Sequence, residues 1–261
     1  TQKIPSIFSD IALDYGRTII EKLEIGTGGY SDSNGHEFIR EAIAEFIDKR
    51  DDVLKNNGIR SNPDNIFLTD GASEGAKNII ELLITNKQDG IMVPIPQYPL
   101  YSATIHRCGG VQINYYTDED EGWILTRDAL EISYSQAEEN GINIRAIVVI
   151  NPGNPTGALY NMAELKALSK IVKKYNIFLI ADEVYREFVY DNAKHYSVLE
   201  LNNVLQHTIV IDSVSKRYSM CGARIGCIIS KNSEFISTAM KFAQARLSPP
   251  TLAQIASTAA M

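Results

Sequence analysis

The chain contains 261 residues, of which 44% are hydrophobic, and its formal net charge at pH 7 is −7. This length and apolar content are sufficient for one large α/β domain with a sizeable core. The acidic balance argues against nucleic acids and anionic membrane surfaces as partners, because binders of either class favour basic patches. Small-molecule chemistry is therefore the expected role.

Cysteine and histidine usage narrows the chemistry further. The three cysteines have no C-x-x-C spacing, which predicts neither a disulfide framework nor a zinc site and favours a reducing cytoplasm; they are Cys108, Cys221 and Cys227. The histidines are scattered, so we expect no metal centre; they are His36, His106, His195 and His207. No apolar run approaches the ~18 residues of a membrane span, and the opening TQKIPSIFSD lacks a signal-peptide pattern.

The first part of the chain predicts two helices separated by a polar, glycine-rich loop. The first helix is expected around Ile7–Lys22 and is followed by GTGGYSDSNG. In HEFIREAIAEFIDKR, apolar residues recur at helical spacing and predict a helix with one buried stripe.

From there the pattern alternates between helical stretches and short apolar runs. Continuous β-branched runs are typical of strands buried on both faces, as in a mostly parallel sheet covered by helices. The runs are Ile66–Leu68, Ile91–Val93, Val111–Tyr115, Ala146–Ile150, Phe178–Ala181, Thr208–Ile211 and Ile225–Ile229. Asn161 and Glu164 have the spacing of a capping box before the periodic run Leu165–Tyr175. One α/β domain is predicted.

Polar and glycine-rich segments follow four of these runs. In doubly wound sheets ligands bind beyond the carboxyl ends of the strands, so these segments are the candidate site. They are TDGASEG after Leu68, NPGNPTG after Ile150, DEVY after Ala181 and DSVSK after Ile211.

Each segment alone has an ordinary explanation as a turn, a cap or a surface charge. Gly71–Gly75 also matches the G-x-S-x-G nucleophile elbow of an α/β-hydrolase, with Ser73 as the nucleophile and Asp182 and a later histidine, His195 or His207, as its partners. That hypothesis leaves NPGNPTG and Lys216 without roles.

A pyridoxal 5'-phosphate site gives all four segments a role. An aldehyde cofactor needs a lysine amine that can be neutral, which nearby cations favour, and Lys216 has Arg217 and Arg224 near it in sequence. A carboxylate must keep the ring nitrogen protonated, and Asp182 is the candidate.

The other polar groups of the cofactor have candidates too. Asn154 and Tyr185 can donate hydrogen bonds to the ring oxygen. Backbone N–H groups of Gly71–Ser73 at a helix start, together with Arg224, can bind the phosphate.

Six motifs in this order resemble the class I/II aminotransferases, which are fold type I pyridoxal-phosphate enzymes. They are YSDSNG, LTDGASEG, PIPQYPLY, VVINPGNPTG, ADEVYREF and DSVSKRYSMCGARIG. The resemblance covers nearly the whole chain. It implies a three-layer α/β/α sandwich with a mostly parallel, largely seven-stranded sheet.

The resemblance also implies roles for residues at the lysine and phosphate ends of the site. Lys216 would form the internal Schiff base and carry the proton between the substrate Cα and the cofactor. The eight-residue step from Lys216 to Arg224 matches the spacing of the phosphate-binding arginine in the family. Ser213, Ala72 and Ser73 would join Arg224 on the phosphate.

At the ring end the resemblance implies that Asp182 pairs with the pyridine nitrogen and that Tyr185 and Asn154 bond the ring oxygen. Tyr98 would stack on the ring face. Tyr30 matches the tyrosine that reaches the phosphate of the neighbouring subunit, which implies a homodimer with shared sites.

Two departures from the family pattern shape the expected domain organisation. We expect an N-terminal helix and loop remnant over 1–35, a large cofactor-binding domain over 36–261, and no C-terminal small domain with its substrate-carboxylate arginine. Nothing in the sequence around Arg246 indicates that it replaces this arginine. The N-terminal segment that closes over the substrate in the family is here absent or reduced to Thr1–Asp14. We therefore expect weak or no transamination from this chain alone.

The reaction expected for the family is a ping-pong amino transfer. The residues within these motifs favour a small L-amino acid donor, alanine or aspartate, with 2-oxoglutarate as the acceptor. Other fold type I reactions, such as those of lyases and decarboxylases, and a non-catalytic cofactor-binding domain remain alternatives.

Overall fold

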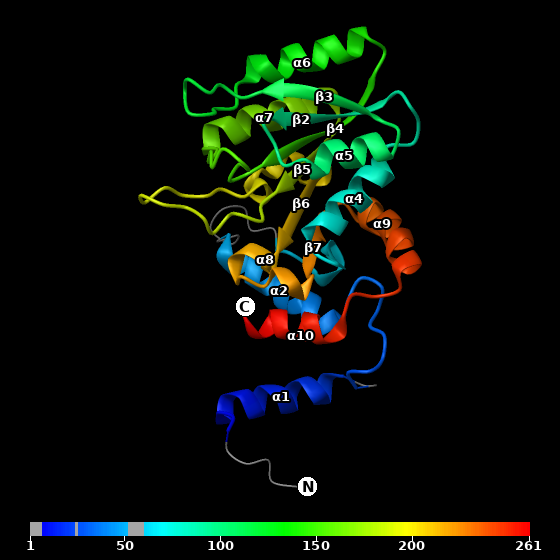
Figure 1. Cartoon of the computed structure of the whole chain (residues 1–261), viewed down its shortest axis with the longest axis vertical. Helices are drawn as coiled ribbons and strands as arrows, with labels where there is room; N and C mark the ends of the chain where they lie inside the picture. The colour runs from blue at the N-terminus through cyan, green and yellow to red at the C-terminus, as the bar shows by residue number, and fades with distance from the viewer. Residues whose placement is uncertain (1–6, 24–25, 52–59) are drawn as a thin grey trace.

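The computed structural model describes residues 7–23, 26–51 and 60–261, which form a single seven-stranded sheet with helices on both faces (Figure 1). The strand order is β1-β7-β6-β5-β4-β2-β3. The strands are β1 (Ile66–Thr69), β2 (Asp89–Ile95), β3 (Val111–Tyr116), β4 (Asn143–Ile150), β5 (Phe178–Asp182), β6 (Thr208–Ser213) and β7 (Gly226–Ile229). Each lies on a predicted run. β7 pairs antiparallel with both neighbours, and the other pairs are parallel.

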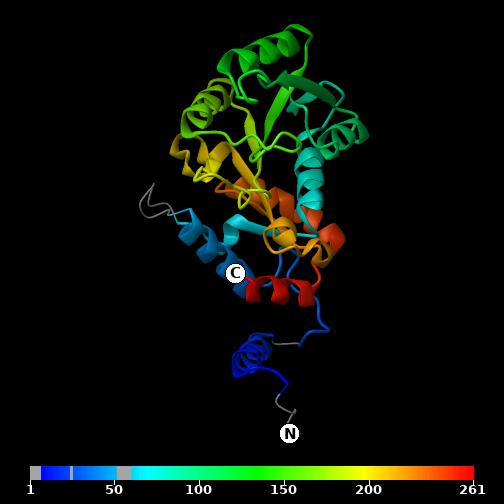
Figure 2. The same ribbon diagram turned by 60° about the vertical axis from the view of Figure 1, so that its left-hand side comes forward.

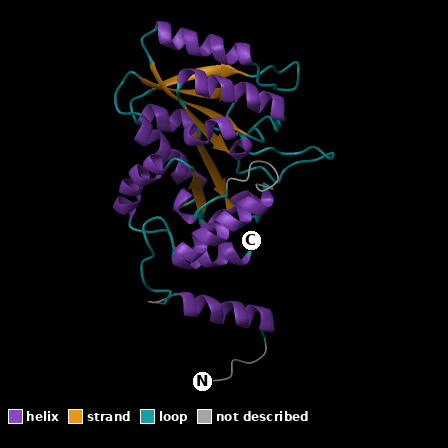
Figure 3. Ribbon diagram, turned by 180° about the vertical axis from the view of Figure 1, so that it is seen from behind, coloured by secondary structure: helices purple, strands orange, loops and turns teal. Residues whose placement is uncertain are grey.

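Two groups of helices cover the two faces of the sheet (Figures 2 and 3). One face packs against α2 (Glu37–Arg50), α6 (Arg127–Glu139) and α7 (Met162–Tyr175). The other packs against α4 (Ala72–Leu83), α5 (Leu100–Arg107) and α9 (Ser233–Arg246). The predicted three-layer α/β/α sandwich is confirmed.

The central strand β4 shows why the sequence pattern is a continuous apolar run. Ile147 and Val149 point into the core beneath α6 and α7, whereas Val148 and Ile150 belong to the core on the opposite face. All four side chains are at most 3% exposed. Because both faces are covered over residues 146–150, that part of the strand contains no polar residue, whereas Asn143 and Arg145 near its start are not buried.

The predicted capping box at the start of α7 is present. The side chain of Asn161 accepts hydrogen bonds from the N–H groups of Ala163 and Glu164, and the Glu164 carboxylate accepts one from the N–H of Asn161. The second Glu164 oxygen accepts a bond from the N–H of Leu125, 2.9 Å away. The cap therefore also fixes the segment that leads into α6.

The remaining helices are short or peripheral. They are α1 (Asp10–Lys22), α8 (Val214–Arg217), α10 (Thr251–Ala259) and the 3-10 turns η1 (Pro63–Asn65), η2 (Val198–Glu200), η3 (Asn202–His207) and η4 (Cys221–Ala223). α1, predicted to begin near Ile7, begins at Asp10 and contacts α10 through Tyr15, whose hydroxyl lies 2.8 Å from Thr258 Oγ1. Within the described ranges, no helix has the length and apolar character needed to cross a membrane.

Candidate active site

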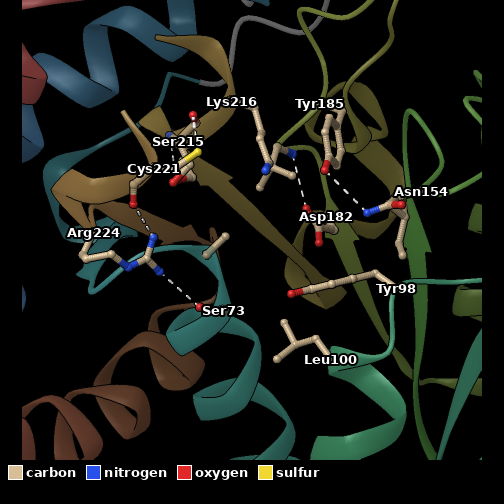
Figure 4. Close-up of a pocket in the computed structure, with 14 residues that line it drawn as sticks. Ser73, Tyr98, Leu100, Asn154, Asp182, Tyr185, Ser215, Lys216, Cys221 and Arg224 are labelled. Atoms are coloured by element: carbon tan, nitrogen blue, oxygen red, sulfur yellow. Dashed lines mark hydrogen bonds between the residues drawn. The ribbon is translucent and has the colours of Figure 1, made fainter. Parts of the chain in front are cut away.

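A cavity of about 230 Å³ opens at the carboxyl ends of the parallel strands (Figure 4). Nine of the ten residues predicted for the cofactor line it: Ala72, Ser73, Tyr98, Asn154, Asp182, Tyr185, Ser213, Lys216 and Arg224. Five further residues that the sequence did not single out complete the wall: Leu100, Ile150, Val184, Ser215 and Cys221. Segments far apart in the chain therefore meet at one place.

Lys216 lies on α8, the single helical turn that follows β6, and its side chain is half-buried. Its Nζ lies 5.5 Å from the centroid of the Tyr185 ring. Among the described residues, the Lys216 amine makes no hydrogen bond and no ion pair. The amine is therefore available to react with a ligand in the cavity.

Arg217 does not serve as the cation beside Lys216 that its place in the sequence predicts. Its guanidinium bonds both carboxylate oxygens of Asp212, at 3.0 and 2.9 Å, and Glu187 at 3.2 Å. These two carboxylates draw the side chain away from the cavity and neutralise its charge. Arg224 is thus the arginine that lines the cavity.

Asp182, the last residue of β5, is buried below the Lys216 amine. Its Oδ2 accepts a 2.7 Å hydrogen bond from the Tyr101 hydroxyl, and Oδ1 accepts one from the Val184 N–H at 3.3 Å. Burial raises the pKa of Asp182 to about 6, and the two hydrogen bonds oppose that rise. The carboxyl group is therefore mostly ionised at pH 7.5 and presents a negative charge at this end of the cavity.

Tyr101 contacts the candidate site through Asp182 and was not predicted from the sequence. It is fully buried in the first turn of α5 and does not line the cavity, so its only route to the chemistry is through Asp182. No local signal in the sequence marks it, because its partner Asp182 lies 81 residues further along the chain.

Asn154 and Tyr185 lie side by side next to Asp182 (Figure 4). The Asn154 amide nitrogen is 3.5 Å from the Tyr185 hydroxyl, which is a long contact for a hydrogen bond. Both groups can therefore turn toward a ligand oxygen. The Tyr98 ring, 48% exposed, crosses the cavity beside these residues and offers a face for stacking.

Arg224 and the start of α4 form the opposite, anion-binding end of the cavity. Arg224 Nη2 lies 3.3 Å from Ser73 Oγ and 3.1 Å from the Asp70 carbonyl oxygen. Gly71 caps the helix without a side-chain bond, so the first N–H groups of α4 have no partner within the helix. Those N–H groups and the guanidinium together suit an anion.

Two glycines allow the chain to pack closely at the anion-binding end of the cavity. Gly71 has φ +89°, and a Cβ there would lie 2.1 Å from Arg224 Nη2. A Cβ on Gly226 would lie 2.6 Å from the Ala72 backbone nitrogen. Only residues without a side chain permit the guanidinium and β7 to approach the α4 start this closely.

Ser213 lines the cavity, but its hydroxyl is already engaged. Ser213 Oγ lies 2.8 Å from the Ile225 carbonyl oxygen and accepts a bond from the Ser215 N–H at 3.1 Å, which caps α8. The predicted phosphate contact of Ser213 would have to share this oxygen. Ser215, one residue before Lys216, is a further hydroxyl at the same wall.

Tyr30 is the predicted site residue that the structure does not bring to this cavity. Its side chain is 74% exposed and lines a separate hollow of about 460 Å³ with His36 and Phe38. Its expected contact with a neighbouring subunit stays a prediction.

The hydrolase triad is not assembled among the described residues. Ser73 Oγ is bonded by Arg224, and Asp182 is bonded by Tyr101. His195 Nε2 is bonded to the Asn151 carbonyl oxygen, 3.1 Å away, and is buried. His207, the other candidate, ends η3 before β6 and lies against the Phe178 ring, with 6.5 Å between the centroids. The G-x-S-x-G match is therefore part of the anion-binding turn.

The cavity as a whole matches the cofactor expected from the sequence. A carboxylate lies at one end, a guanidinium and a helix start lie at the other, and a reactive amine stands between them (Figure 4). A pyridine nitrogen, an aldehyde and a phosphate need these three groups in this order. The glycine-lined anion end is shaped for a ligand oxygen rather than for a side chain.

Comparison with known proteins identifies the family. The profile described as "Aminotransferase class I and II" matches residues 19–261. A probable mitochondrial alanine aminotransferase of Dictyostelium discoideum is 44% identical over 187 residues, which are 72% of this chain and 34% of that protein. Glutamate–glyoxylate aminotransferase 1 of Arabidopsis thaliana is 40% identical over 241 residues, or 88% of this chain and 49% of that protein. The chain thus spans between a third and a half of the length of these relatives.

Comparison with solved structures points to the same family. An aromatic aminotransferase from Pyrococcus horikoshii superposes with a TM-score of 0.80 at 27% identity and covers 95% of this chain and 63% of its own. Alanine aminotransferase from Pyrococcus furiosus gives a TM-score of 0.77 at 31% identity, with 96% and 60% coverage. The chain belongs to the class I and II aminotransferases, a pyridoxal-phosphate-dependent family.

Proposed function

We propose that this chain binds pyridoxal 5'-phosphate through Lys216 and that the protein transfers an amino group from a small L-amino acid to a 2-oxo acid. The observation that carries the proposal is the Lys216 amine standing between the Asp182 carboxylate and the Arg224 guanidinium in one cavity. A structural lysine would be expected to pair with a carboxylate or to point into solvent.

The bound cofactor would supply an electron sink for the substrate Cα carbon. The chain would supply position and protons. Asp182, ionised near neutral pH, would hold a proton on the ring nitrogen, and the Lys216 Nζ would take the Cα proton and deliver it to the cofactor carbon on the other side of the amino nitrogen. Asn154 and Tyr185 would donate to the ring oxygen, and Tyr98 would cover one ring face.

Alanine is the amino donor that the sequence relatives favour. Three named alanine aminotransferases, from Dictyostelium and Arabidopsis, are 39 to 44% identical to this chain. Aspartate, the other donor expected from the motifs, has support from a Thermus thermophilus aspartate aminotransferase structure at 26% identity. We therefore propose alanine as the donor and 2-oxoglutarate as the acceptor. Glutamate with glyoxylate is the second candidate pair, because the glutamate–glyoxylate aminotransferase of Arabidopsis is 40% identical to this chain.

A non-catalytic role is the alternative of a different class. One relative, 36% identical over 202 residues, is named an inactive alanine aminotransferase of Saccharomyces cerevisiae. Such a protein could keep the cofactor cavity without turnover. The expectation that this chain alone transaminates weakly or not at all stays a prediction, as does a cytoplasmic location, since several relatives are named mitochondrial.

The homodimer belongs to the same proposal. Tyr30 lies on a described loop with its ring exposed, as a residue that serves a neighbouring subunit would. In a second copy its hydroxyl would add a donor to the phosphate end.

The experiment is a spectroscopic titration followed by a donor screen. The purified chain mixed with pyridoxal 5'-phosphate should acquire the visible absorption of a lysine-bound pyridoxal, and Lys216→Ala should abolish that band. Lys166→Ala, on the exposed side of α7, is the matched control and should leave it unchanged. Alanine, glutamate and aspartate are then tested with 2-oxoglutarate and glyoxylate as acceptors.

Two results would contradict the proposal. A band that survives in Lys216→Ala would remove the lysine from its role. Esterase activity that depends on Ser73, in a protein that binds no cofactor, would restore the hydrolase hypothesis. Cofactor binding without amino transfer to either acceptor would agree both with the weak transamination expected of this chain and with the non-catalytic alternative, so it is the Lys216-dependent band that tests the cofactor half of the proposal.

A further inference from the structure

Arg246, the last residue of α9, lies outside the cavity but joins three separate segments of the chain. Its side chain is only 14% exposed. Nη1 donates to Glu74 Oε2 at 2.7 Å, and Nη2 donates to the carbonyl oxygens of Ser33 at 2.8 Å and Leu68 at 3.1 Å. The planar fork of a guanidinium, unlike a lysine ammonium, can hold such partners at fixed angles.

One of these contacts leads to the anion-binding end of the cavity. Glu74 lies in the first turn of α4, and its carboxylate also accepts a hydrogen bond from the Asp70 N–H. The carbonyl oxygen of Asp70 in turn accepts a bond from Arg224 Nη2. Arg246 is therefore linked to Arg224 through Glu74 and Asp70, and its Nη1 also lies 3.6 Å from Asp70 Oδ1.

A second contact leads to the loop that carries Tyr30. Ser33 follows Tyr30 by three residues, and its carbonyl oxygen is held by Arg246. The fully buried Gln254 of α10 holds the same loop by accepting from the His36 N–H and donating to Ser31 Oγ, both at 3.1 Å. The backbone of the loop is thus fixed while the Tyr30 ring projects outward.

We propose that Arg246 is a positioning residue that sets both halves of the phosphate-binding apparatus, the start of α4 within its own subunit and the Tyr30 loop directed at the neighbour. The inference rests on the proposed function. Arg246 does not line the cavity, so it acts through Glu74 and Asp70 on one side and through Ser33 on the other. Its effect on a ligand is therefore specific to the phosphate group.

The test compares two ligands that differ only in that group. Pyridoxal 5'-phosphate and pyridoxal are titrated into the cofactor-free full chain, with visible absorption as the readout. Arg246→Met, which keeps an apolar stem but no donors, should weaken the phosphate ester by about tenfold, the scale of one charge-assisted hydrogen bond. Pyridoxal, which uses Lys216 but not the anion end, should change by less than about twofold.

Further variants separate positioning from general destabilisation. Arg246→Lys restores the charge beside Glu74 and should recover part of the loss. Glu74→Gln weakens the same link from the other side, and the double variant should cost less than the sum of the two single variants, because Glu74 and Arg246 both act on Asp70. Arg127→Met, which removes an exposed pair with Glu131 on α6, is the matched control and should bind both ligands as the unaltered chain does.

The Tyr30 half of the proposal has its own readout. In a Tyr30→Phe background, Arg246→Met should cost less affinity for pyridoxal 5'-phosphate than in the unaltered chain. Equal losses in the two backgrounds would remove the Tyr30 half. Equal losses for pyridoxal and its phosphate, or no loss for either, would overturn the inference while leaving the proposed function intact. An unaltered chain that binds neither ligand through Lys216 would overturn both.

Discussion

Asp182 and Tyr101 form a buried pair in which each side chain controls the other. The Tyr101 hydroxyl has no exposure and donates to Asp182, so it remains protonated: burial and the carboxylate both raise its pKa well above the ordinary value. The donated bond in turn favours the charged carboxylate that burial disfavours. The Tyr101 hydroxyl, together with the Val184 N–H, therefore limits how far the pKa of Asp182 rises.

The substitution Tyr101→Phe should raise the pKa of Asp182 further above 6 and reduce its charged fraction near neutrality. We expect the affinity for pyridoxal 5'-phosphate to fall by about tenfold at pH 7, because a hydrogen bond to a charged group is lost. The loss should grow as the pH falls from 8 to 6. Fluorescence titration at several pH values measures it.

The control for this prediction is Tyr115→Phe on β3. The Tyr115 hydroxyl is equally buried and donates to the Val148 carbonyl oxygen at 2.7 Å, away from the cavity. This variant should lose stability without losing affinity. A Tyr101→Phe variant that binds as tightly as the unaltered chain at every pH would contradict the proposed link through Asp182.

Both the backbone conformation at residue 71, with φ +89°, and the close approach of Arg224 require a glycine there. Gly71→Ala would place a methyl group 2.1 Å from the position of Arg224 Nη2, so the guanidinium must move. We expect about tenfold weaker binding of pyridoxal 5'-phosphate, measured by absorption titration. Gly109→Ala shares the strain of positive φ, at +75°, but its new methyl group would meet nothing within 4 Å. That variant should lose stability and keep its affinity.

Residue types and spacing predicted most of the cavity because its members follow strand ends. Lys216, Asp182 and Asn154 each stand just after a buried run, where the fold gathers them. Tyr101 and Arg246 could not be found in this way, because their roles arise from contacts with residues far away in the chain. Arg217 misled the prediction, since the sequence does not reveal that Asp212 and Glu187 engage its charge.

Among the secondary-structure elements, the helix N-termini differ in how their N–H groups are satisfied. α7 begins with reciprocal bonds between Asn161 and Glu164, and these residues are readable in sequence because a cap needs only local partners. α4 begins instead at Gly71, with no side-chain cap. The start of α7 is therefore capped by side chains, whereas the first N–H groups of α4 face the cavity without a side-chain cap.

Asn161→Ala should destabilise the protein by about 1 kcal/mol, because two N–H groups of α7 lose their acceptor. Urea unfolding followed by circular dichroism measures the change. Asn161→Asp keeps a capping oxygen and should stay within about 0.5 kcal/mol of the unaltered chain. Equal stability of the alanine variant would mean that the contact between Glu164 and the Leu125 N–H alone holds the helix start.

The strand predictions succeeded for a physical reason that also sets their limit. The edge strand β3 exposes Asn114 and Tyr116, whereas the central strands are covered on both faces over most of their length, so their sequence there is a continuous apolar run. Such a run contains no information about direction, and the reversal of β7 was therefore not predictable from its residues. The start of α1 at Asp10 reflects a Ser9 cap that periodicity alone does not locate.

At the scale of the whole molecule, buried charges and a buried imidazole behind the cavity link stability to pH. Arg50 and Arg217 both pair with Asp212, and Arg186 pairs with Asp51 at 2.7 Å. His195 lies beside this group and is 8% exposed. Burial, and then the positive charge of Arg186, lower the pKa of His195 to about 3.

A lowered pKa of this size makes folding sensitive to acid. The unfolded chain takes up a proton at His195 below about pH 6.5 and the folded chain does not, so stability present above that pH is lost as the pH falls toward 3. Between pH 7.5 and 5.0 this one group should remove about 2 kcal/mol from the free energy of unfolding. His195→Gln keeps a donor for Asn151 and should lose that much less over the same range.

Urea unfolding at the two pH values measures this difference, with His106→Gln on the exposed side of α5 as the control. The control should follow the unaltered chain. Burial also raises the pKa of Glu183 to about 7, which favours the folded state as the pH falls, so only the difference between variants isolates the histidine. Parallel pH profiles for the unaltered chain and His195→Gln would contradict the prediction.

The reversal of β7 has a consequence for the order in which the site can assemble. Because β6 and β7 are antiparallel neighbours paired at Ser213 and Gly226, one connection of twelve residues holds both Lys216 and Arg224. Closing so short a loop costs little chain entropy, whereas Asn154 and Asp182 depend on long crossovers between parallel strands. The proposed covalent anchor, Lys216, and the ionic anchor, Arg224, thus lie on one short connection, and we expect the pairing of that hairpin alone to set the spacing between them.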